Sequence, residues 1–152
     1  MTAIPALPSL APTQDERTMA TLAQALSILG FLAPLIIFLI KRQSRFVSFH
    51  ALQAVLWHAI YFAAILVAVF GFIFVMFFSI AHTVATKGNE PPLAMFAFIP
   101  VLWLLIAAGS IINLVLAIVY AIKAGQGEWA EYPVIGRWAR RMLKIGPGGA
   151  PI

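Results

Sequence analysis

The sequence predicts an all-α integral membrane protein with three transmembrane helices and a C-terminal basic amphipathic helix at the membrane interface. Hydrophobic residues form 62% of the 152-residue chain and charged residues only 10%, whereas a soluble domain is nearer half apolar and a quarter charged. The apolar residues fall in runs long enough to cross a bilayer. Most cations lie at the ends of these runs, which is typical of helical membrane proteins.

Residues 1–17 are predicted to form a disordered lead-in to the membrane domain, which we place at residues 18–123. The first thirteen residues contain three prolines and no charge, a composition typical of mobile chain ends. They lack the basic start of a signal peptide. We therefore expect the first apolar run to serve as its own insertion signal.

The first span is predicted at residues 21–40, a run without any charge. Its length matches a hydrocarbon core of about 30 Å. Pro34 lies inside the run and is expected to kink the helix. Four small residues fall on one helical face, where another helix is expected to approach closely: Ala23, Ser27, Gly30 and Pro34.

The second span is predicted at residues 51–81, and an aromatic segment in the head-group layer leads into it. One face of this span carries large apolar side chains that we expect to contact lipid: Leu66, Phe70, Ile73, Phe74 and Phe77. A polar turn separates it from the third span, which is predicted at residues 93–122. The third span has a stripe of small and polar residues suited to close packing: Gly109, Asn113, Ala117 and Ala121.

The tail at residues 128–145 is predicted to be an amphipathic helix that lies in the cytoplasmic membrane interface. Its apolar side chains fall on one side of a helix: Val134, Ile135, Trp138, Met142 and Ile145. Its cations fall on the other: Arg137, Arg140, Arg141 and Lys144. Residues 146–152 are expected to be a disordered tail.

The distribution of cations predicts the orientation of the chain. With three spans, the loop at residues 41–45 and the C-terminal tail lie on one side and hold eight of the ten cations. The positive-inside rule then places the N-terminus outside and the C-terminus in the cytoplasm. We expect a multi-pass protein of the cell (inner) membrane.

Composition also limits the chemistry that the chain can perform. It has no cysteine, which excludes disulfides and thiolate metal sites. The predicted spans carry no Asp, Glu, Lys or Arg, which argues against a proton relay or an ion-coupled transporter. We find no nucleophile–base pair and no phosphate-binding glycine loop. The sequence therefore predicts a non-enzymatic protein without a catalytic residue, metal or cofactor.

The net charge of +5 points to a bilayer with anionic head groups as partner rather than to nucleic acid, because the cations cluster at span ends. We expect six of them to contact lipid head groups: Lys41, Arg42, Arg137, Arg140, Arg141 and Lys144. The alternative for the four tail cations is docking of an acidic partner.

Two residue types in the spans have more than one interpretation. His50 or His58 can bind a haem or a pigment axially, or can be a packing histidine bonded to a neighbour. Asn113 can hydrogen-bond between helices, or line a polar pore. The sequence alone leaves these alternatives open.

Two motifs resemble a known family. The run RFVSFHALQAVLW at residues 45–57 follows a pattern of Arg-aromatic-Val-x-Phe-(Asn/His)-Ala-(Met/Leu)-Gln-(Ala/Ser). The run AIKAGQGEWAEYPVIGR at residues 121–137 has an Ala-x-Lys-Ala end, a glycine and a Tyr-Pro pair. These runs resemble the Tic-translocon-like family of small helical membrane proteins, related to a plastid import-channel component, and its short bacterial relatives of unassigned function.

The resemblance implies a protein-translocation component that acts as a homo-oligomer or with other membrane proteins. We assign its partner interface to Arg45, Phe49, His50, Gln53, Trp57, Asn113 and Tyr132. The alternative function is an accessory subunit of a larger energy-converting or pigment-binding membrane complex, with His50 or His58 as ligand.

Overall fold

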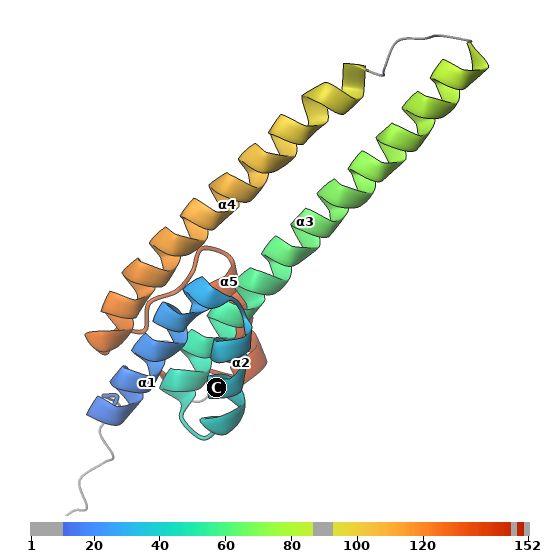
Figure 1. The fold of residues 1–152 in the computed structure, drawn as a ribbon. Coiled ribbons are helices and arrows are strands. Elements are labelled where there is room, and N and C mark those ends of the chain that lie inside the picture. The colour runs from blue at the N-terminus through green and yellow to red at the C-terminus, as the bar shows by residue number, and fades with distance from the viewer. Residues whose placement is uncertain (1–10, 87–92, 147–148, 151–152) are drawn as a thin grey trace, which may run out of the picture. The chain divides into compact units, whose positions relative to one another are not determined.

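The computed structural model describes residues 11–86, 93–146 and 149–150, and these residues form helices and no strand (Figure 1). The chain divides into two compact units. The terminal unit comprises residues 1–58 and 115–152, and the central unit comprises residues 59–114. The all-α class predicted from the sequence is confirmed.

Five α-helices and one short 3-10 helix make up the described chain. They are α1 (Gln14–Ala25), η1 (Leu26–Leu29), α2 (Leu32–Ile40), α3 (Arg45–Ala85), α4 (Leu93–Gly125) and α5 (Ile135–Leu143). α1 begins four residues before the predicted start of the membrane domain. The expected disorder of residues 1–10 and of most of the C-terminal tail lies outside the described residues, as does most of the turn between α3 and α4.

The predicted first span is wrong, because residues 21–40 do not form one helix. The chain breaks at Gly30, which has φ 123° and ψ −173°. Only glycine adopts this backbone region readily. Pro34 does not kink a long helix either. It lies in the first turn of α2, where the N–H that proline lacks would have no intrahelical partner.

Among the residues that the structure describes, two helices, and not three, are long and apolar enough to cross a membrane. They are Arg45–Ala85 and Phe96–Gly125. The predicted second span falls within the first of these, and all but the first three residues of the predicted third span fall within the second. The side chains expected to face lipid on α3 are exposed, with Phe77 at 69%. Residues 46–54 of α3 are buried in the terminal unit. Beyond these residues the helix presents mainly exposed side chains.

In place of a span, residues 14–40 form a helical hairpin, which we call the N-terminal hairpin. α1 and α2 contact each other and run in opposite directions (Figure 1). Asp15 at the start of α1 forms an ion pair with Lys41 directly after α2, with 3.0 Å between Oδ2 and Nζ. Three of the four small residues expected to face another helix are buried: Ala23, Ser27 and Pro34.

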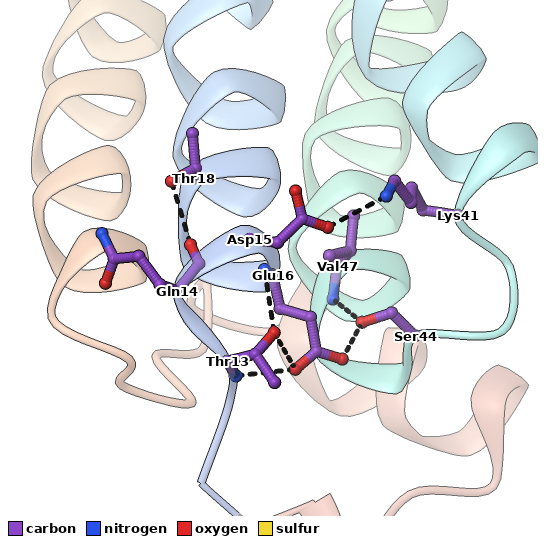
Figure 2. A network of polar contacts seen from close by, with 8 residues as sticks. All are labelled: Thr13, Gln14, Asp15, Glu16, Thr18, Lys41, Ser44 and Val47. Atoms are coloured by element: carbon purple, nitrogen blue, oxygen red, sulfur yellow. Dashed lines mark hydrogen bonds and ion pairs between the residues drawn. The ribbon is translucent and has the colours of Figure 1, made fainter.

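A polar network at the open end of the N-terminal hairpin joins α1 to α3 (Figure 2). Thr13 and Glu16 form a capping box, in which each side chain binds the other residue's backbone N–H. The second oxygen of Glu16 accepts a hydrogen bond of 2.7 Å from the Ser44 hydroxyl. Ser44 Oγ in turn accepts the N–H of Val47 in the first turn of α3. One carboxylate therefore stabilises two helix starts.

The two long helices contact each other within the central unit through Tyr61 and Gly109. The Tyr61 hydroxyl donates a hydrogen bond of 3.1 Å to the carbonyl of Ile106, and a side chain at Gly109 would collide with the Tyr61 ring. The small stripe predicted on the third span therefore includes a point of close approach. The rings of Phe72 and Phe98 stack with centroids 4.9 Å apart.

α5 packs on the start of α3. Phe49, Leu52, Ala139 and Ile145 form a buried apolar cluster. Ile135 and Ile145 of the predicted apolar face are buried, but Val134, Trp138 and Met142 are exposed. The helix therefore divides its apolar side chains between the core and the surface.

We expect the network in Figure 2 to make stability depend on acid pH. The hydrogen bonds from Ser44 and from the Thr13 backbone lower the pKa of Glu16. A carboxyl with a lowered folded-state pKa stabilises the fold above its unfolded pKa, and this contribution is lost as the pH falls through the folded value. The thermal midpoint of Glu16→Gln in detergent should therefore fall less than that of wild type between neutral and acid pH. Equal losses in the two proteins would contradict the assignment.

Candidate functional site

The start of α3 is the most enclosed part of the described chain. Residues 46–54 are all buried, so protein covers every side of two and a half helical turns. Three of these residues are polar, namely Ser48, His50 and Gln53. Buried polar groups require partners, and the identity of those partners defines the site.

Two buried glutamines and one tyrosine form a hydrogen-bond network that we call the Gln–Tyr network. The Tyr132 hydroxyl donates to Gln24 Oε1 over 2.6 Å, and Gln24 Nε2 donates to the carbonyl of His50 over 2.9 Å. The Tyr132 backbone N–H donates to Gln53 Oε1 over 2.6 Å. Gln53 Nε2 donates to the carbonyl of Ala130 over 3.2 Å. Both glutamine side-chain amides thus donate a hydrogen bond from the nitrogen and accept one at the oxygen.

His50 connects the same part of α3 to the segment that follows α4. Its Nε2 lies 3.0 Å from the carbonyl oxygen of Glu128, and a carbonyl only accepts, so we assign the proton to Nε2. The ring contacts Phe46 and Phe49, with centroid distances of 4.7 and 5.5 Å. The His50 side chain is fully buried and Nδ1 is enclosed. Axial binding of a haem or pigment at His50 would require this packing to open.

Residues 127–132, which we call the crossing segment, supply most of these partners. The segment starts at Gly127, whose φ of 80° lies in the left-handed region that favours glycine. Trp129 packs edge-on against Phe46 with centroids 5.2 Å apart. Burial raises the pKa of Tyr132 above its ordinary value. The hydroxyl therefore remains a neutral donor to Gln24 at neutral pH.

The predicted partner interface divides into buried and accessible residues. Phe49, His50, Gln53 and Tyr132 are buried, and the last three form hydrogen bonds within the chain. Arg45 is exposed at the start of α3, while Trp57 and Asn113 are half-buried. The structure brings His50, Gln53 and Tyr132 together; Asn113 belongs to the other unit. The sequence analysis missed Gln24, whose polarity in an apolar run was the available signal.

The cations predicted to bind lipid head groups differ in exposure and in their partners within the chain. Arg42, Arg137, Arg141 and Lys144 are exposed, and Lys41 forms its ion pair with Asp15. Arg140 turns inward instead. It binds the Glu131 carboxylate, donates to the Gly146 carbonyl over 2.6 Å, and lies 5.0 Å above the Phe49 ring. Arg140 therefore ties the end of α5 to the core.

Within residues 11–86, 93–146 and 149–150, no group of three His, Cys, Asp or Glu side chains is placed to bind a metal. The charged groups at the site form pairs within the chain, as in Lys123 and Glu128 at 2.9 Å. The arrangement is a polar core that joins four segments: α1, the start of α3, the crossing segment and α5. Its chemistry is hydrogen bonding between neutral groups, which fixes position.

A model of the magnetosome magnetite crystal formation protein family (MamF/MmsF) matches residues 15–139. The chain belongs to this family. The match begins in α1 and ends in α5, so it includes the N-terminal hairpin, both long helices and the crossing segment. Searches of curated proteins and of solved structures give no match.

Membership of the magnetosome family corrects the resemblance drawn from the sequence. The chain is not assigned to the Tic-translocon-like family, and the function of a protein-translocation channel is withdrawn with it. The alternative, a subunit of an energy-converting or pigment-binding complex, has no better support. The residues on which the resemblance depended, at 45–57 and 121–137, include much of the packing between α3, the crossing segment and α5. A resemblance at packing residues indicates that two proteins pack their helices in a similar way, and it is weaker evidence that they share an activity.

Removing the Tyr132 hydroxyl should destabilise the terminal unit. Tyr132→Phe leaves Gln24 Oε1 buried without its donor, at a cost of about 1–3 kcal/mol. Tyr120→Phe is the matched control, because its hydroxyl donates over 2.6 Å to the Glu131 carbonyl at an exposed position, where water can replace it. Chemical unfolding in detergent measures both. A loss for Tyr120→Phe equal to that for Tyr132→Phe would contradict the importance of the Gln–Tyr network.

Proposed function

We propose that this chain is a non-enzymatic membrane protein that takes part in forming magnetite crystals. The observation that carries the proposal is the family match over residues 15–139. The two helices of membrane-spanning length and hydropathy support a location in the membrane. The family's name supports the magnetosome membrane as that location.

We further propose that both chain ends lie in the cytoplasm. The predicted outside position of the N-terminus depended on three spans, and the N-terminal hairpin returns the chain to the side from which it entered. Arg17 then joins the cations on the side of the termini, so that nine of ten lie there and only Lys87 falls between the spans. The positive-inside rule favours this two-span arrangement more strongly than the three-span arrangement, in which eight of ten cations lie on one side.

The proposed mode of action is contact with lipid and with other proteins of the same membrane. The exposed cations of the terminal unit support contact with anionic head groups: Arg42, Arg45, Arg137, Arg141 and Lys144. The Gln–Tyr network supports a positioning role for the buried polar residues, because the Tyr132 hydroxyl binds Gln24 and both glutamine amides bind backbone groups of other segments. A homo-oligomer remains part of the proposal.

Complementation tests the proposed function. We expect expression of this chain in a magnetite-forming bacterium that lacks its own family member to restore most of the lost crystal length, measured by electron microscopy. Gln53→Leu, which removes the acceptor for the Tyr132 N–H, should restore less, and Gln126→Leu, the same substitution at an exposed position outside the Gln–Tyr network, should restore about as much as wild type. Immunoblots of the membrane fraction control for protein level. Wild-type protein at normal level with crystals unchanged from the deletion strain would contradict the proposal.

A further inference from the structure

The outer surface of the N-terminal hairpin is apolar and exposed over most of its length. Leu29 at its tip is 84% exposed and Leu32 is 62% exposed. α2 contains only apolar residues. The large apolar side chains exposed on this surface are Leu22, Ile28, Leu29, Phe31, Leu32, Ile36, Leu39 and Ile40. A surface of this kind needs a specific occupant.

Polarity changes along the hairpin from its open end to its tip. The open end carries Asp15, Glu16 and Arg17 on α1, and Lys41 and Arg42 after α2. Residues 18–40 between them carry no charge. A membrane leaflet has the same order, with charged head groups outside and acyl chains inside.

The hairpin lies beside the apolar part of a membrane-spanning helix within the terminal unit. The Thr21 hydroxyl donates a hydrogen bond of 3.3 Å to the carbonyl of Ala121. Ala121 is two residues before Lys123, the cation that ends the apolar run of α4. Thr21 in the middle of α1 therefore lies beside the end of the apolar run of α4.

Each α-helix of the hairpin is about as long as one leaflet is thick and too short to cross the whole bilayer. α1 has 12 residues and α2 has 9, which at 1.5 Å per residue gives lengths of about 18 and 14 Å. A hydrocarbon core is about 30 Å thick, so one leaflet contributes about 15 Å.

Polar groups within the hairpin turn away from its apolar surface. Gln24 binds the carbonyl of His50 and the hydroxyl of Tyr132. Ser27 Oγ donates to the carbonyl of Gln24 over 2.6 Å, and the N–H of Gly30 bonds to the carbonyl of Ser27. Pro34 has no N–H to satisfy in the first turn of α2. These features reduce the cost of placing irregular backbone in hydrocarbon.

We infer that the N-terminal hairpin is a re-entrant element that inserts into the leaflet on the side of the chain ends. Lipid acyl chains cover its apolar outer surface, and residues 29–32 reach deepest into that leaflet. The charges at its open end lie among the head groups. The inference goes beyond the proposed function and depends only on the membrane location.

Acyl chains fit this surface better than a protein partner does. A partner would need no gradient of polarity along the hairpin axis, whereas a leaflet requires one. The direct transition from Ile40, which is 71% exposed, to Lys41 and Arg42 matches the boundary between acyl chains and head groups.

Depth-dependent fluorescence quenching tests the inference on the full chain in vesicles of phosphatidylcholine and phosphatidylglycerol. The chain has no cysteine, so single variants carry one thiol-linked fluorophore each. We choose Leu29→Cys at the tip, Gln14→Cys at the open end, and Phe70→Cys, which is 66% exposed on the long helix α3, as the acyl-chain control. Leu29 is largely exposed, so its replacement leaves the packing of the hairpin intact.

For each variant we compare quenching by lipids brominated deep in the acyl chains with quenching at the head group. For Leu29→Cys and for Phe70→Cys we expect the ratio of the first to the second to exceed one. For Gln14→Cys the ratio should be below one. A tip fluorophore quenched mainly by an aqueous quencher would overturn the inference, because the hairpin would then lie in water. A tip protected from every quencher would also overturn it and would indicate a protein partner or second copy. The complementation assay measures crystal length and does not depend on where the hairpin lies. The re-entrant hairpin and the proposed function can therefore fail separately.

Discussion

The Gln–Tyr network is the constraint on which the terminal unit depends. It joins residues 24, 53 and 132, which lie far apart in the chain, and each of its polar atoms is buried. A buried polar group without a partner costs about 1–3 kcal/mol. Folding therefore favours the arrangement in which the three segments that carry these residues contact one another. Their meeting holds α1 beside α3. With α1 in that position, the break at Gly30 allows α2 to return beside α1, so residues 21–40 do not form one helix of membrane-spanning length.

Sequence patterns sufficed for the two long helices, because an uninterrupted apolar run has few other solutions in a membrane protein. They failed at residues 21–40, since hydropathy and length are the same for a span and for a hairpin. What distinguishes the two is the backbone conformation of Gly30 and the partner of Gln24. Neither can be read from composition, because glycine is tolerated in membrane helices and a polar residue does not name its partner. Similarly, α5 looked like an interfacial helix, yet Arg140 turns inward.

All but the first residue of the N-terminal hairpin lies within the part of the chain that the family model matches. The family match begins in α1, so the hairpin is part of what the family model describes and is not an appendage. The terminal unit is built from both ends of the chain and carries the exposed cations Arg42, Arg45, Arg137, Arg141 and Lys144. The proposed contacts with lipid and with partners therefore fall on that unit. Most of the motif that first suggested a partner site is buried and holds the unit together.

The most direct test of a hairpin in place of a span is the proximity of Asp15 and Lys41. Their charged groups lie 3.0 Å apart, whereas a continuous helix would separate the two residues by about 39 Å. The double variant Asp15→Cys/Lys41→Cys, treated in membranes with a short bis-maleimide and digested, should yield one peptide pair crosslinked within a single chain, identified by mass spectrometry. The single variants are the controls. Full reaction of both thiols without that crosslinked pair would contradict the hairpin.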